Sequence, residues 1–191
     1  MGRRADAEKR ARILASAFRV FGEQGFTRTT MKGIAERAGI VPGSIYIYFR
    51  GKEALFEATV EQGWQRFLSE LDRAAFSPRP LRERLETVID LGFSELRRSL
   101  PLLQGMLFEA SRRRLLQDKL EGLCRTLERL FREERREPPR IGAGRHGKTM
   151  IRITVMGILF SAALAPPERI EPELSALKAA VRRLLAERLG P

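Results

Sequence analysis

The chain has 191 residues, of which 43% are apolar and 31% are charged, and its 36 Lys and Arg residues outnumber 24 Asp and Glu residues to give a formal charge of +12. This is the composition of a globular protein with a packed core, and it excludes a disordered chain and a protein embedded in a membrane. A positive surplus of this size favours a polyanionic partner, although charge alone does not distinguish DNA from RNA or lipid headgroups.

The positive charge is concentrated at the amino terminus, where residues 1–50 hold ten Lys or Arg residues and four acidic residues. The single cysteine, Cys124, excludes an internal disulfide and has the apolar neighbours of a core residue. No apolar signal segment opens the chain, and its most apolar run, residues 150–165, contains Arg152 and is too short to span a membrane. We therefore expect a cytoplasmic protein without membrane association.

The amino-terminal part of the chain predicts three helices and a tight turn. Gly25 can end the first helix, Thr29 or Thr30 can cap the second, Gly39 supplies the turn and Pro42 is suited to open the third. The helices predicted from apolar spacing cover residues 6–24, 31–37 and 42–48.

The remaining chain predicts a larger helical domain. Apolar residues at helical spacing continue from Lys52 to the carboxy terminus, and Pro101 is expected to end a helix that begins at Leu81. No segment has the alternation of a strand. The sequence thus predicts an all-α protein with a three-helix helix-turn-helix domain over residues 1–50, followed by a helical ligand-binding and dimerisation domain over residues 51–191.

Residues 30–49, TMKGIAERAGIVPGSIYIYF, meet the demands of a helix-turn-helix. Ala35 is small where the two helices would cross, Gly39 is flexible in the turn, and apolar residues on both sides can lock the angle. A helical hairpin without a DNA role would have the same pattern, but the basic charge of this segment and its tyrosines favour DNA.

This segment resembles the TetR (tetracycline-repressor-like) family of bacterial transcriptional regulators. The matching positions fall within residues 13–56 and are Gly25-Phe26, Thr29-Thr30, Ile34-Ala35, Ala38-Gly39-Ile40, Gly43, Tyr46, Tyr48-Phe49 and Lys52 to Phe56. The resemblance implies a DNA-binding regulator, and most simply a repressor that a small molecule releases from double-stranded operator DNA.

The resemblance also implies residue roles, because the third helix of such proteins enters the major groove. It places Tyr46, Tyr48 and Lys52 at phosphates of the DNA backbone, and Thr30 and Lys32 at the backbone or the groove edge. Those it turns towards bases are Pro42, Gly43, Ser44 and Ile47.

Four further positions sharpen this interpretation. Ile45 and Phe49 would face inward, and because Tyr48 lies between Ile47 and the inward-facing Phe49, we expect Tyr48 to be better exposed than Tyr46. Val41 stands where the family commonly has a small residue, and the third helix therefore lacks a side-chain cap. Gly33 stands where an acidic residue is common.

A second motif competes with this interpretation. Residues 142–149, GAGRHGKT, match the phosphate-binding pattern G-x-x-x-x-G-K-[ST]. Such a loop needs a buried strand before it, whereas residues 135–140 are charged and contain two prolines. A basic loop is the better interpretation, and with one histidine and one distant cysteine we expect no metal site, no cofactor and no enzyme activity.

The larger domain offers apolar residues that suit an effector pocket between helices. The candidates are Phe93, Leu96, Leu103, Met106, Glu109, Met150, Arg152 and Phe160. Arg152 is a cation in an apolar helix, and two roles are open for it: a structural pair with Glu109, or a contact with the carboxylate of a hydrophobic, acidic effector.

A homodimer is expected, because one helix-turn-helix covers only half of an operator. The resemblance places the dimer contact in the last two helices, and the apolar run around Ile158 fits this. An architectural DNA-binding protein without an effector and a nucleotide-hydrolysing enzyme remain the alternatives.

Overall fold

The computed structural model describes residues 2–108, 110–133 and 147–189, and each regular element within these ranges is helical. The amino-terminal elements are α1 (Gly2–Arg28), α2 (Met31–Arg37), the short 3-10 helix η1 (Pro42–Ser44) and α3 (Ile45–Tyr48). The remaining elements are α4 (Lys52–Ala75), α5 (Leu81–Phe108), α6 (Ala110–Glu133), α7 (Gly147–Leu164), the 3-10 helix η2 (Pro167–Arg169) and α8 (Ile170–Leu189). The predicted all-α fold is confirmed.

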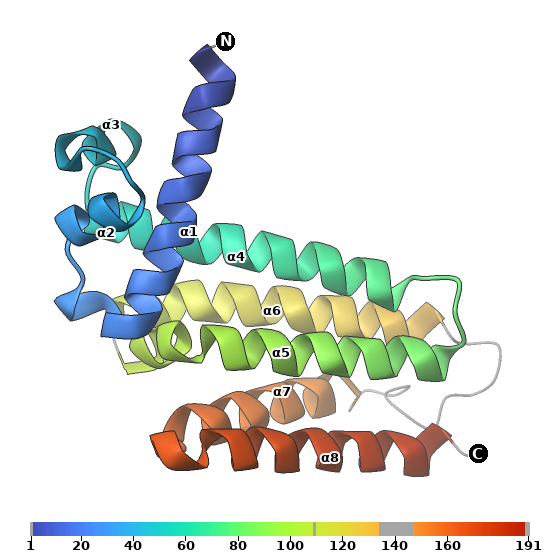
Figure 1. Ribbon diagram of the computed structural model, residues 1–191. Helices are drawn as coiled ribbons and strands as arrows, with labels where there is room; N and C mark the ends of the chain where they lie inside the picture. The colour runs from blue at the N-terminus through green and yellow to red at the C-terminus, as the bar shows by residue number, and fades with distance from the viewer. Residues whose placement is uncertain (1, 109, 134–146, 190–191) are drawn as a thin grey trace.

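The helices form a small head and a layered body. In Figure 1, α1 stands against one end of α4, α5 and α6, with α2 and α3 beside it, while α7 and α8 lie along the other side of α5 and α6. Helix α5 is the centre of the body, since it packs against α1, α4, α6, α7 and α8. The head, which comprises α1 to α3, therefore touches the body, which comprises α4 to α8, mainly through the contacts of α1 with α4 and α5.

Aromatic and branched residues fill the core of the head. Ile13, Ile34 and Ile45 are fully buried, and the rings of Phe21 and Phe56 meet edge-to-face with centroids 5.1 Å apart. Because Phe56 belongs to α4, this core continues past residue 50. The division of the chain into domains at that residue stays a prediction.

Proline 101 does not end a helix, which corrects the prediction from the sequence. α5 runs through Pro101, although a proline inside a helix removes one hydrogen bond and costs about 3 kcal/mol. Leu100 and Leu102 flank it and are 2% and 6% exposed. Fully burying one leucine contributes about 1.5–3 kcal/mol, so packing on both sides of the proline outweighs its cost.

Gly25 interrupts α1, but the chain resumes helical geometry as far as Arg28. Its φ of 73° lies in the region that favours glycine, while its ψ of 170° is not that of the predicted left-handed helical turn. The hydroxyl of Thr29 donates a hydrogen bond to the Gly25 carbonyl (2.7 Å), which stabilises the bend.

The remaining predictions concern the phosphate-loop-like motif, Cys124 and membrane spans. Residues 142–146 of the phosphate-loop-like motif lie outside the described residues, and residues 147–149 begin α7. Cys124 is 6% exposed, so the predicted core position is confirmed. Among the described helices, none combines the length and apolar character needed to cross a membrane.

Candidate nucleic-acid interface and ligand cavity

Local chemistry fixes the turn between α2 and α3. The side-chain oxygen of Thr30 accepts a hydrogen bond from the Gly33 amide (3.0 Å), and this caps α2 as predicted. Gly39 adopts a φ of +66°, which a residue with a Cβ avoids. Pro42 opens η1, and Val41 before it makes no side-chain cap. α3 is therefore held at a fixed position beside α2.

One side of α3 is buried and the other faces water. Ile45 and Phe49 are 0% and 5% exposed, which confirms their predicted inward orientation. Ile47, Val41 and Tyr46 are 81%, 71% and 58% exposed. Large apolar side chains left in water forgo the free energy of burial, and a group of them on one face is typical of a contact surface.

The two tyrosines of α3 have the opposite exposure from that expected. Tyr46 is the exposed one, whereas Tyr48 is partly buried against the core of the head and donates a hydrogen bond to the Asp6 carboxylate (3.1 Å). Burial, the Asp6 hydrogen bond and the Asp6 charge together raise the pKa of Tyr48. The neighbouring residues Ile47 and Phe49 did not reveal from sequence which tyrosine is exposed. The reason is that α3 is only four residues long and follows a 3-10 turn.

Lys52 begins α4 but is engaged within the protein. Its ammonium donates to the Thr27 carbonyl (3.3 Å) and lies 4.5 Å from the centre of the Phe26 ring. This joins the start of α4 to the end of α1. A phosphate contact by Lys52 would have to be made alongside these contacts, and it stays a prediction.

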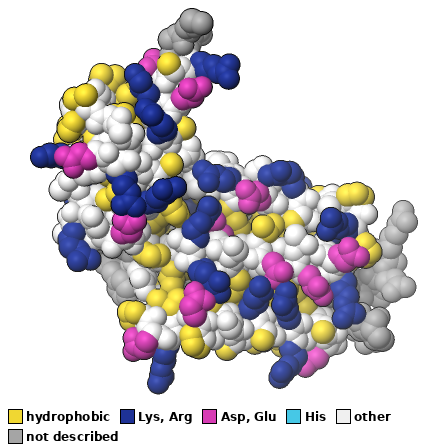
Figure 2. Space-filling model, viewed as in Figure 1, with side chains coloured by type: hydrophobic (Ala, Val, Ile, Leu, Met, Phe, Trp, Pro, Cys, Tyr) yellow, Lys and Arg dark blue, Asp and Glu magenta, His cyan; other side chains and the backbone are white. Residues whose placement is uncertain are grey.

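The other residues with a predicted DNA role lie at this same end of the head. Thr30 and Gly43 are exposed, Pro42 and Ser44 are half-buried, and the Lys32 side chain is 75% exposed and 3.9 Å from Glu36. Figure 2 shows Lys and Arg side chains on the head, where the head meets the body, and along the body. The surface can therefore offer apolar, hydroxyl and cationic groups together.

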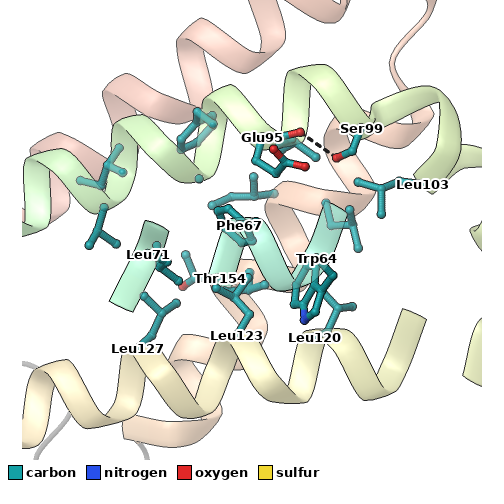
Figure 3. Close-up of a pocket in the computed structure, with 18 of the residues that line it drawn as sticks. Trp64, Phe67, Leu71, Glu95, Ser99, Leu103, Leu120, Leu123, Leu127 and Thr154 are labelled. Carbon is teal, nitrogen blue, oxygen red and sulfur yellow. Dashed lines mark hydrogen bonds between the residues drawn. The ribbon is translucent and has the colours of Figure 1, made fainter. Parts of the chain in front are cut away.

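A cavity of about 430 Å³ lies in the body between α4, α5, α6, α7 and α8. Its wall is almost entirely apolar and includes the aromatic side chains Trp64 and Phe67 of α4 (Figure 3). Phe18 of α1 also lines it, so the cavity reaches the head. Such a volume is in the range of small-molecule sites.

Most of the predicted effector residues lie in the wall of this cavity. They are Phe93, Leu96, Leu103, Met106 and Met150. Arg152 and Phe160 are exposed and are not in the wall, so Arg152 is not the buried cation that the sequence suggested. Its place in an apolar helix misled because α7 exposes part of its apolar surface. Glu109 lies outside the described residues.

Glu95 is the charged residue that the described wall does contain. Its side chain is 17% exposed and forms an ion pair with Arg98 one helical turn away on α5. Burial raises the pKa of Glu95, and the Arg98 charge and hydrogen bond oppose this rise. The hydroxyls of Ser99 and Thr59 donate to carbonyls of their own helices (2.7 and 2.6 Å). The rest of the wall is thus apolar in character.

Comparison with known proteins places the head in a family. Residues 13–59 match the family described as bacterial regulatory proteins, tetR family, and this range covers α2, η1, α3 and the adjoining parts of α1 and α4. In this amino-terminal segment the chain belongs to the TetR family. Within it, the chain is 38% identical over 68 residues to the uncharacterized HTH-type transcriptional regulator YfiR of Bacillus subtilis, which is 36% of this chain and 33% of YfiR.

Solved structures of transcriptional regulators extend the likeness to the whole fold. FadR from Bacillus subtilis, solved with stearoyl-CoA, has a TM-score of 0.69 at 22% identity over 92% of this chain and 96% of FadR. SmeT, the repressor of a Stenotrophomonas maltophilia multidrug efflux pump, has a TM-score of 0.63 at 28% identity over 90% of this chain and 89% of SmeT. The sequence match with YfiR itself spans about a third of that protein's length.

Several features of this chain were not found from sequence. Arg37 of α2 pairs with Glu23 of α1 (2.7 Å), and this ties the two helices together from positions 14 apart. Trp64, Phe67 and Glu95 line the cavity. The helical spacing of Trp64 and Phe67 identified an apolar face of α4, but spacing does not distinguish a face that meets another helix from one that lines a hollow.

Proposed function

We propose that this chain represses transcription by binding operator DNA through its head and that a small hydrophobic molecule in the cavity releases it. Phe18 carries the proposal, because this one side chain of α1 packs against the core of the head and also lines the cavity. A ligand that fills the cavity would therefore touch the helix that supports α2 and α3. Such a regulator works on DNA in the bacterial cytoplasm.

The exposed face of the head supplies the proposed DNA contacts. Ile47 and Ser44 would meet bases, since apolar and hydroxyl groups both read base edges in the major groove. Tyr46 and Lys32 would meet phosphates, and Thr30 would lie at the backbone with them. We propose Tyr48 and Lys52 as weaker phosphate contacts, because the hydroxyl of Tyr48 and the ammonium of Lys52 already have hydrogen-bond partners in the protein.

The proposed dimer uses α7 and α8. On α7, Ile153, Phe160 and Leu164 are 60%, 45% and 66% exposed and follow each other at spacings of seven and four residues, with the exposed Gly157 between them. These spacings place them on one face of a helix. Ile158, by contrast, is half-buried and lines the cavity, so it is not the residue whose charge would test the dimer.

The wall of the cavity supports a hydrophobic effector. Its residues include Trp64, Phe67 and Met106, which offer large apolar surfaces. FadR of Bacillus subtilis, with the same fold, was solved with stearoyl-CoA, which has a long apolar chain. An effector is the feature that separates this proposal from an architectural DNA-binding protein, which has no need of a cavity.

Footprinting of the purified chain on genomic fragments that it retains tests the proposal. We expect a discrete protected site with two-fold symmetry, and Ser44→Ala should weaken binding to that site by up to about 3 kcal/mol while leaving binding to random duplex unchanged. Lys32→Ala is the matched variant and should weaken both alike. Uniform coating of the fragments would contradict a regulator and favour an architectural role.

A further inference from the structure

A second hollow adjoins the cavity where the head meets the body. Its volume is about 350 Å³, and Phe18, Thr59 and Gly63 line both hollows. Three arginines from three different helices line the second one: Arg19 of α1, Arg66 of α4 and Arg98 of α5. Its described wall contains no carboxylate. We call it the arginine cleft.

The charges of this cleft are only partly neutralised. Arg98 pairs with Glu95 and lies over the Phe18 ring at 5.4 Å. Arg19 and Arg66 are exposed and have no ion pair or hydrogen bond with the part of the chain that the structure describes. Three guanidinium groups that face one hollow repel each other, and an anion among them removes that repulsion.

We propose that the effector is an amphiphile. Its apolar chain occupies the cavity, and its phosphate group occupies the arginine cleft. This rests on the proposed function, since it names the ligand of the same cavity. Guanidinium groups donate paired hydrogen bonds to phosphate oxygens, which suits three arginines better to phosphate than to a neutral head. The two hollows share three wall residues and therefore adjoin, and the proposed ligand would extend from one into the other.

Glu95 is a carboxylate and would favour a cationic ligand group, but the surrounding arginines favour an anionic one. A cation at Glu95 would have to displace Arg98 and would sit among Arg66 and Arg98. An anion needs no displacement, because Arg19 and Arg66 are available. A bound anion would also connect α1 to α4 and α5. The phosphate group of the ligand could therefore shift the DNA-binding head of the protein directly.

Trp64 provides the readout, because it is the single tryptophan of the chain and it lines the cavity. Its fluorescence in the full-length protein is titrated with decyl phosphate, decanol, decyltrimethylammonium and inorganic phosphate. We expect decyl phosphate to bind at least about tenfold more tightly than decanol, since hydrogen bonds to charged groups contribute more than neutral ones. Inorganic phosphate should neither change the fluorescence nor displace decyl phosphate at matched concentration.

Variants assign the difference to the cleft. The double variant Arg19→Ala/Arg66→Ala should lower the affinity for decyl phosphate to that for decanol. Arg82→Ala, which removes an exposed arginine outside both hollows, should not do so.

Equal binding of decyl phosphate and decanol by the unmutated chain would overturn the phosphate site in the arginine cleft and leave the cavity as an effector site. Tightest binding of decyltrimethylammonium would overturn it in favour of Glu95, and displacement by inorganic phosphate would overturn the single amphiphile. No response to any of the three decyl compounds would overturn the proposed function as well.

Discussion

The head and the body of this chain use their side chains in opposite ways. In the head, Ile13, Ile34 and Ile45 have no exposed surface, and single residues such as Thr30 and Gly39 each satisfy one geometric demand. In the body, apolar side chains surround a cavity of about 430 Å³ instead of filling it. Protein interiors are normally close-packed, so a hollow of this size forgoes stability that filling would supply. The head is built for one shape, whereas the body keeps room for a ligand.

The largest effect is expected from a charge on the outer face of α7, because it tests whether the body also holds a second copy. Phe160→Glu should make the chain monomeric and lower operator affinity by about a hundredfold or more, since a buried unpaired charge costs several kcal/mol. Sedimentation and an operator binding titration measure the two effects. Phe160→Leu should keep the dimer. A dimer that survives Phe160→Glu with full operator binding would sink the assignment of this face.

One substitution should have opposite signs in the two regions. Gly39→Ala forces a Cβ into a φ of +66° and should lower the free energy of unfolding by about 1–2 kcal/mol. Gly63→Ala lies in the α4 helix, where an added Cβ meets nothing within 4 Å, and should raise it by about 0.5–1 kcal/mol. Urea unfolding of the two variants checks the pair. If both variants changed the free energy of unfolding in the same direction, the proposed contrast between head and body would be wrong.

A smaller effect is expected at Ile47, whose exposed side chain contributes little to the fold. Ile47→Ala should leave the melting temperature unchanged and weaken operator binding about fivefold, on the order of 1 kcal/mol for a partly buried apolar contact. If Ile47 meets a thymine methyl group, uracil in place of that thymine should reproduce the loss, and the two changes together should not add. Additive losses would argue against this contact.

The smallest effect concerns Glu95, the charge in the apolar wall. Its pKa is raised by burial above the ordinary carboxyl value of 4.5. The folded chain then holds this proton more firmly than the unfolded chain, so the free energy of unfolding falls as the pH rises from 4.5 through the raised pKa. Glu95→Gln lacks this penalty and should gain stability relative to the unmutated chain as the pH rises from 4.5 through the raised pKa. A constant difference across that range, measured by thermal unfolding, would contradict the role of burial.

The features that could be predicted from the sequence lie mostly in the head, and those that could not lie mostly in the body. The α2 cap, predicted at Thr29 or Thr30 and found at Thr30, the Gly39 turn and the inward Ile45 follow from local rules, because the responsible residue lies next to its effect. The helix end at Pro101 was predicted wrongly, and the exposure of Arg152 was not anticipated, because both depend on packing between distant helices. Packing of Leu100 and Leu102 carries α5 through the proline, and no local pattern contains that information.

The cavity was predictable as a set of apolar residues but not as a space. Phe93, Leu96 and Met106 were chosen for their size, and they do line it. The arginine cleft was not visible, because Arg19, Arg66 and Arg98 come from three helices and are separated by 47 and 32 positions. Such a cluster appears only when α1, α4 and α5 are placed together.

One titration tests the central claim, that a ligand in the body controls DNA binding by the head. A labelled duplex containing the footprinted site is saturated with the full-length protein, and decyl phosphate is added while fluorescence anisotropy of the duplex and fluorescence of Trp64 are followed together. The account predicts that both signals change over the same concentration range, with the duplex released as the cavity fills. A Trp64 signal that saturates while the duplex stays fully bound would contradict it.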